Sequence, residues 1–212
     1  MKTDDLIAVL VEDQAVRSPN PRTAIMGALA VGVVIAAVLF MSVLGYRPDI
    51  AAAAGTYRFL FKFVFTITLA ASAIGLVFQI FRPEAAPGRW LWFIALGPVM
   101  LLAAALAELL VMPSATWMPR LIGVNARFCL TEIPLLSIVP LLAFLWALRH
   151  TAPANPGLAG ALAGLGSGGI AATLYASHCV DDSPLFVMTW YSLAIGLITL
   201  IGYFAGRRWL AW

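Results

Sequence analysis

Long runs of apolar residues dominate the chain, and short polar segments separate them. Six of these runs are long enough to form a helix of about 20 residues, the length that crosses the hydrocarbon core of a bilayer. Their predicted bounds are residues 23–44, 60–81, 90–112, 130–148, 157–176 and 184–205. The pattern therefore predicts an all-α membrane protein, with six transmembrane helices in residues 23–206 and a short tail at 207–212.

Composition supports the bilayer as the main solvent of this protein. The chain is 62% hydrophobic and 11% charged, whereas soluble domains carry about 25% charged residues. No loop is long enough to form a soluble domain, so an active site on a soluble lobe is excluded. The basic residues form no clustered stripe, so direct binding of nucleic acid is not predicted. The chain also offers no haem ligand pair or phosphate-binding loop, and no obligatory cofactor is expected.

Basic residues set the expected orientation, because cytoplasmic loops carry an excess of Lys and Arg. With six spans, both termini lie on one side. That side holds eight basic residues: Lys2, Arg17, Arg22, Arg82, Arg89, Arg149, Arg207 and Arg208. The other side holds five: Arg47, Arg58, Lys62, Arg120 and Arg127. The bias favours cytoplasmic termini and places the loops after the third and fifth spans outside the cell membrane.

The N-terminal arm, residues 1–22, is the only stretch that looks soluble. Thr3 is a good N-cap for a short helix, and Asp4 and Asp5 complement the positive end of the helix dipole. The apolar face of this helix consists of Leu6, Ile7, Leu10 and Val11. An amphipathic helix on a proline-rich tether is one way to present a docking peptide. An interfacial helix without a partner remains the alternative.

Three glycines and two carboxylates stand out within the spans. Gly160, Gly164 and Gly168 recur every four residues, which allows close approach of a second helix, so we expect the fifth span to be enclosed by other helices. Glu108 and Glu132 are costly at membrane depth and need a partner. An ion pair with Arg120 or Arg127 is the structural expectation, and a proton relay is the functional alternative.

The two cysteines carry the most informative chemistry. Cys129 and Cys179 are predicted at the same face of the membrane, near the outer ends of the fourth and fifth spans. They can be small buried hydrophobes, form a disulfide in an oxidising compartment, or bind a soft metal such as Cu, Zn or Cd. The candidate metal ligands are Cys129, Cys179, His178, Glu132, Asp181 and Asp182. Their spacing matches no standard zinc motif.

Several segments resemble a known family of six-span membrane anti-sigma factors, the negative regulators of sigma F of proteobacteria. The resemblance is strongest in HCVDDSPLF at 178–186, followed by Trp190 and Tyr191. It continues in MKTDDLI at 1–7, the prolines at 19 and 21, RFCL at 127–130 and IPLLS at 133–137.

The resemblance implies a regulator that is not an enzyme. Such proteins hold an extracytoplasmic-function sigma factor at the inner membrane and release it under heavy-metal or oxidative stress. The sensing cysteines of the family correspond to Cys129 and Cys179. On this interpretation the sigma factor docks on the arm through Asp4, Asp5, Leu6, Ile7, Leu10 and Val11. Two other functions stay open: a small metal or proton transporter, and a quinone-linked thiol redox protein.

Overall fold

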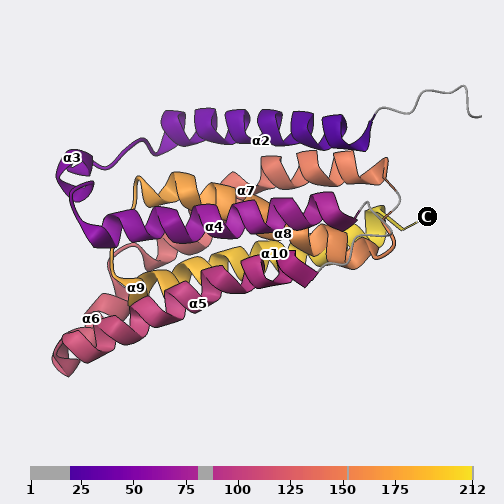
Figure 1. The fold of residues 1–212 in the computed structure, drawn as a ribbon. Coiled ribbons are helices and arrows are strands. Elements are labelled where there is room, and N and C mark those ends of the chain that lie inside the picture. The colour runs from indigo at the N-terminus through magenta and orange to yellow at the C-terminus, as the bar shows by residue number, and fades with distance from the viewer. Residues whose placement is uncertain (1–19, 81–87, 152, 212) are drawn as a thin grey trace, which may run out of the picture.

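The computed structural model describes residues 20–80, 88–151 and 153–211. The predicted docking residues of the arm therefore lie outside the described residues. The elements in chain order are α2 (Pro21–Val43), α3 (Ile50–Ala53), α4 (Tyr57–Ile80), α5 (Gly88–Val111), the 3₁₀ turn η1 (Ser114–Thr116), α6 (Trp117–Ile122), α7 (Ala126–Arg149), α8 (Pro156–Ala176), α9 (Pro184–Phe186), the π-helical turn η2 (Val187–Tyr191) and α10 (Ser192–Trp209). The described part contains helices and no strand (Figure 1).

The six predicted spans are confirmed. Six helical segments are long and apolar enough to cross a membrane. Five of them lie within a few residues of the predicted bounds, whereas the fourth begins at Ser114, because it includes η1 and α6 ahead of α7. The sixth span differs in kind, because it consists of α9, the π-helical turn η2 and then α10. Single π-helical turns within helices are rare in proteins, and those that occur often lie at functional sites. Pro184 opens α9 at its first turn, where its missing N–H costs nothing.

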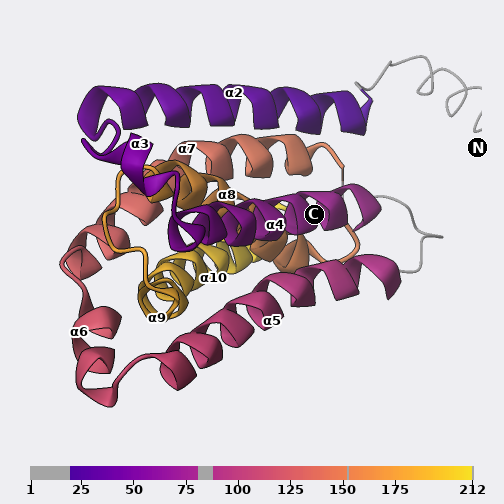
Figure 2. The ribbon, with the colours of Figure 1, turned by 60° about the vertical axis from the view of Figure 1, so that its left-hand side comes forward.

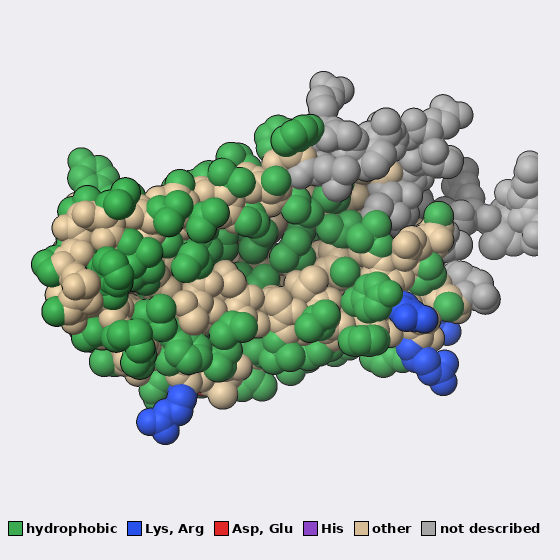
Figure 3. All heavy atoms as spheres, turned by 90° about the horizontal axis from the view of Figure 1, so that it is seen from below, with side chains coloured by type: hydrophobic (Ala, Val, Ile, Leu, Met, Phe, Trp, Pro, Cys, Tyr) green, Lys and Arg blue, Asp and Glu red, His purple; other side chains and the backbone are tan. Residues whose placement is uncertain are grey.

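The helices run up and down, so their connections gather at two ends. α2 begins and α10 ends at one end, which we call the terminal end (Figures 1 and 2). α3, α6 and α9 lie together at the opposite end, which we call the cysteine end. On the face in Figure 3, hydrophobic side chains cover the middle of the molecule and basic side chains lie near its two ends. This distribution fits a surface that faces lipid between two polar layers.

α8 is enclosed by its neighbours, as the glycine spacing predicted. Within an 18-residue stretch, 67% of α8 is buried, against 22% of α5. A Cβ atom at Gly164 would lie 2.5 Å from the carbonyl oxygen of Ile198 in α10. At Gly160 a Cβ atom would meet the backbone of Gly202 and Gly206. Glycine therefore allows α8 and α10 to pack backbone against backbone.

Candidate functional site

The two cysteines meet in the core at the cysteine end. Cys129 lies in the first turn of α7, and Cys179 lies in the loop of residues 177–183, which we call the Cys179 loop. Both are fully buried free thiols. They belong to one hydrophobic cluster with Tyr175, Phe186 and Tyr191. The sequence prediction that both thiols reach the same end of the bundle is confirmed.

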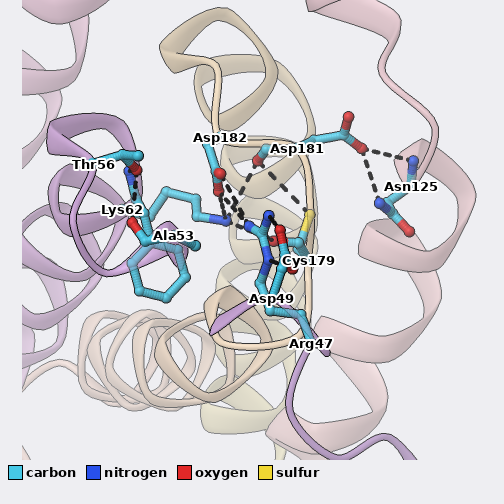
Figure 4. Close-up of polar contacts among 10 residues, drawn as sticks. Arg47, Asp49, Ala53, Thr56, Lys62, Asn125, Cys179, Asp181 and Asp182 are labelled. Carbon is cyan, nitrogen blue, oxygen red and sulfur yellow. Dashed lines mark hydrogen bonds and ion pairs between the residues drawn. The ribbon is translucent and has the colours of Figure 1, made fainter. Parts of the chain in front are cut away.

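Two basic side chains converge on the backbone of Cys179. The Lys62 ammonium donates a hydrogen bond of 2.8 Å to the Cys179 carbonyl oxygen, and Arg47 Nη1 donates one of 3.2 Å to the same atom. Lys62 is 0% exposed and Arg47 is 7% exposed. Figure 4 shows both side chains reaching this carbonyl from the chain segments before α3 and within α4.

Carboxylates neutralise these two cations. Lys62 Nζ lies 2.6 Å from Asp182 Oδ1, and Arg47 lies 3.0 Å from Asp182 Oδ2 and 2.7 Å from Asp49 Oδ1. Hydrogen bonding to Asp49 raises the pKa of the Arg47 guanidinium, while the same contact lowers the pKa of the Asp49 carboxyl group. Since a buried cation without a partner is strongly unfavourable, the four groups must stay together.

Asp181 fastens the Cys179 loop to the helix that carries Cys129. Its Oδ2 atom accepts hydrogen bonds from the backbone N–H of Val124 at 3.0 Å and of Asn125 at 2.8 Å. The side-chain amide of Asn125 donates a third, at 3.0 Å. A carboxylate at this position suits the positive end of α7. The two cysteine-bearing segments are thus joined by polar contacts as well as by packing.

The opposite side of the Cys179 loop is tied to the end of α2. His178 Nδ1 lies 3.0 Å from the carbonyl oxygen of Gly45, and the N–H of Arg47 donates to the carbonyl of Ser177 at 3.1 Å. Gly45 has a φ of +66°, which favours glycine and lets the chain turn sharply after α2. Movement of the Cys179 loop would therefore act directly on α2.

Glu108 in α5 holds the last residues of the Cys179 loop. Its Oε1 atom pairs with Arg120 at 3.1 Å and Arg58 at 3.3 Å. Its Oε2 atom accepts hydrogen bonds from the Ser183 hydroxyl at 2.5 Å and the Leu185 N–H at 3.3 Å. The predicted ion pair with Arg120 is confirmed, and the carboxylate has four partners.

The surroundings of Cys179 lower the pKa of its thiol. Hydrogen bonding from Cys129 is the largest effect that lowers the pKa of Cys179, and the positive charge of Lys62 lowers it further, although burial opposes both. The thiolate is the reactive and metal-binding form of cysteine. Cys179 is therefore the member of the pair that is better prepared to react.

The six candidate metal ligands are not assembled as one site. Among the described residues, no group of three His, Cys, Asp or Glu side chains is arranged to hold a metal ion. His178, Asp181 and Asp182 face separate partners at Gly45, Asn125 and Lys62. Metal binding at the cysteines stays a prediction, which would require some of these side chains to exchange partners.

Comparison with known proteins assigns the family. Residues 10–212 match the family model described as "Negative regulator of sigma F". The chain belongs to this family. It is 38% identical to "Anti-sigma-F factor NrsF" of Caulobacter vibrioides (strain NA1000 / CB15N), over 100% of both chains. It is 32% identical to "Probable anti-sigma-F factor NrsF" of Azospira oryzae (strain ATCC BAA-33 / DSM 13638 / PS), again over 100% of both. No solved structure matches the chain.

Four residues of this family member's site escaped the sequence prediction. Arg47 and Lys62 were counted only as charges that flank the membrane, and Tyr175 and Tyr191 were given no role at the site. The hydroxyl groups of both tyrosines are buried beside the cysteines without a hydrogen-bond partner in the described part of the chain. The available signal was the position of Lys62 inside a predicted span, because a charge at membrane depth is rarely without function.

Proposed function

We propose that this chain is a membrane anti-sigma factor. It would hold an extracytoplasmic-function sigma factor at the bacterial inner membrane, with both termini in the cytoplasm, and release it when Cys129 and Cys179 react at the periplasmic side. Two relatives named anti-sigma-F factors, each similar over the full length, support the regulatory role. The observation that carries the sensing role is the burial of both free thiols in one cluster.

Oxidation is one input that this site can receive. A peroxide would accept two electrons from the dithiol. Its O–O bond would break, the two thiol protons would end on its two oxygen atoms, and one S–S bond would form between the cysteines. Cys179 would react first because its pKa is lowered, and Cys129 would complete the bond. Binding of Cu, Zn or Cd to the two thiolates is the other input. The buried hydroxyl groups of Tyr175 and Tyr191 would donate to the thiolates that hold a metal, or to the thiolate that reacts before the disulfide forms.

The Cys179 loop would transmit the reaction to the rest of the bundle. Its contacts reach α2 through Gly45 and Arg47, α4 through Lys62, and α5 through Glu108. α2 also packs along α7, where a Cβ atom at Gly32 would lie 2.9 Å from the Cα atom of Pro140. Because α2 leads directly into the N-terminal arm, its displacement would change how the arm is presented.

Release requires only a difference in affinity between two states of the protein. A stimulus shifts such an equilibrium by its differential affinity, about 1.4 kcal/mol for each tenfold change. The sigma factor would bind the arm through the acidic and apolar face predicted above. These side chains are Asp4, Asp5, Leu6, Ile7, Leu10 and Val11.

Co-purification of the sigma factor tests the proposal. The full-length protein is purified from its native membrane, and the bound cytosolic proteins are identified. A variant with Leu6→Ala and Leu10→Ala should lose the sigma factor, whereas Leu193→Ala, an exposed change on α10, should retain it. Recovery of no sigma factor with the unaltered chain would refute the proposal.

The contacts of Glu108 bear on the transporter alternative. A proton carrier must release and rebind its proton during each cycle, whereas this carboxylate is held by two guanidinium groups and two hydrogen-bond donors. The arrangement suits a structural clamp. It therefore favours a regulatory role over ion transport.

A further inference from the structure

A second polar feature lies at the terminal end, far along α7 from Cys129. An open cavity of about 620 Å³ separates the ends of α7 and α10. Its lining consists of Leu142, Leu145, Trp146, Arg149, Arg208, Trp209 and Ala211. The buried Leu210 packs with Leu145 and Leu148 beneath it, so the two helix ends are fixed relative to each other. None of these residues takes part in the cysteine site.

The charge of the cavity calls for an anionic ligand. Arg149 lies in the last turn of α7, and Arg208 lies in the last turn of α10. Both are exposed, and no acidic side chain within the described ranges pairs with either. The neighbouring Arg207 differs, because its guanidinium lies over the ring of Tyr203, 5.8 Å from the centroid. Two guanidinium groups facing one cavity are a recurrent site for phosphate groups.

The polarity of the cavity changes with depth. Leu142, Trp146 and Arg149 lie on one face of α7, at spacings of four and three residues. Seven residues of helix span about 10 Å, so the lining passes from a guanidinium at the helix end to a leucine well inside the hydrocarbon region. The Trp146 side chain is 65% exposed and that of Trp209 is 55% exposed. Tryptophan in such positions is typical of the boundary between headgroups and acyl chains.

We propose that this cavity binds an anionic phospholipid. The phosphate of the headgroup would lie between Arg149 and Arg208, and the beginning of an acyl chain would lie along Trp146 and Leu142. Basic pockets between helix ends bind acidic headgroups in this way. An acidic peptide would satisfy the arginines equally well, but it would leave the apolar depth at Leu142 unfilled. The change of the lining from charged to apolar with depth therefore favours a lipid over a peptide.

Native mass spectrometry of the full-length protein in detergent tests this site. Phosphatidylglycerol is titrated, with phosphatidylcholine as the zwitterionic comparison. Arg149→Gln and Arg208→Gln should each weaken retention of phosphatidylglycerol about fivefold, the effect expected for one basic side chain near an anionic headgroup. Arg207→Gln is the matched control, with the same loss of charge beside the cavity, and should leave retention unchanged. Arg149→Lys and Arg208→Lys keep the charge and should bind.

Three outcomes would overturn the proposal. Equal retention of phosphatidylcholine would mean that the headgroup charge is not recognised. An equal loss of phosphatidylglycerol retention in Arg207→Gln would mean that any nearby positive charge attracts the lipid, whether or not it faces the cavity. Displacement of the lipid by a synthetic peptide of residues 1–17, or by glycerol phosphate alone, would assign the arginines to a soluble ligand. The variants must show unchanged thermal unfolding, and if one glutamine variant unfolds, the other glutamine variant compared with Arg207→Gln decides.

Discussion

The ammonium nitrogen of Lys62 lies 2.8 Å from the carbonyl oxygen of Cys179, although Lys62 is completely buried. A charge at this depth is expensive unless it is paired and hydrogen-bonded. Here the pairing group is Asp182, and the hydrogen-bonded group is the backbone carbonyl of Cys179. The Lys62 side chain therefore contributes to the ion pairs that stabilise the fold, and it also holds the backbone of Cys179 in place.

Replacement of Lys62 should destabilise the bundle strongly. Lys62→Met leaves Asp182 with only Arg47 as a cationic partner, and breaking a buried pair costs about 3–5 kcal/mol. Arg58→Gln is the control, because Arg58 is 40% exposed and its buried partner Glu108 keeps Arg120, Ser183 and Leu185, so a smaller loss is expected. Thermal unfolding in detergent measures both. Similar transitions for the two variants would show that Lys62 is not held as described.

The pH profile of Cys179 should reveal its lowered pKa. In Cys129→Ser the serine hydroxyl keeps a hydrogen-bond donor beside Cys179 and leaves a single thiol. The rate of alkylation should then show a midpoint below the ordinary cysteine pKa of about 8.5. In Cys129→Ala the donor is lost, so the midpoint should move upward.

The same shift predicts a sign for stability. A thiol whose pKa is lowered by folding stabilises the folded state above the pKa of the unfolded chain. This contribution is lost as the pH falls through the lower pKa of the folded state. The apparent unfolding temperature of Cys129→Ser should therefore rise with pH over this interval relative to Cys129→Ala. Superimposable pH profiles of the two variants would show that Cys129 does not act as a hydrogen-bond donor to Cys179.

Glycine at the α8–α10 contact should be irreplaceable. Gly164→Ala places a methyl group 2.5 Å from the Ile198 carbonyl oxygen, and overpacking of this kind costs about 1–3 kcal/mol. Gly196→Ala is the control, since nothing lies within 4 Å of its added Cβ atom. It should be neutral or slightly stabilising. Unfolding temperatures in one detergent compare the two, and equal effects would contradict the close approach of the helices.

Removal of the charge of Glu108 should have a moderate effect. Glu108→Gln keeps an acceptor for Ser183 and Leu185 but unpairs Arg58 and Arg120, which are 40% and 29% exposed and can be solvated. A loss of about 1–3 kcal/mol is expected. Glu132→Gln, at a half-buried position, should cost less than about 0.5 kcal/mol. Greater destabilisation by Glu132→Gln in urea titrations would refute the clamp at Glu108.

The spans were predictable from sequence because each is one long apolar segment whose length is set by the bilayer. The enclosure of α8 followed from the four-residue spacing of Gly160 and Gly164. The shared end of the two cysteines followed from the up-and-down order of the helices. Span length and glycine spacing are local patterns, and the shared end of the cysteines follows from the number of spans between them. None of these predictions requires knowledge of which helices touch.

The contacts of the Cys179 loop could not be predicted in this way. Arg47 and Asp182 are 135 residues apart, and their pairing depends on the lateral arrangement of the helices. The sequence placed His178, Asp181 and Asp182 beside Cys179 and suggested shared ligands, whereas packing directs them to separate partners at Gly45, Asn125 and Lys62. The unpaired hydroxyl groups of Tyr175 and Tyr191 likewise arise only from three-dimensional packing.

Under the proposed function, reaction of the cysteine pair releases a sigma factor at the other side of the membrane. The most direct measurement reconstitutes the full-length protein with its sigma factor and follows the complex as the thiols are oxidised or exposed to Cd²⁺. We expect release from the unaltered chain and none from Cys129→Ser with Cys179→Ser, while both bind equally under reducing, metal-free conditions. Equal release from the double variant would show that the two thiols do not control the sigma factor.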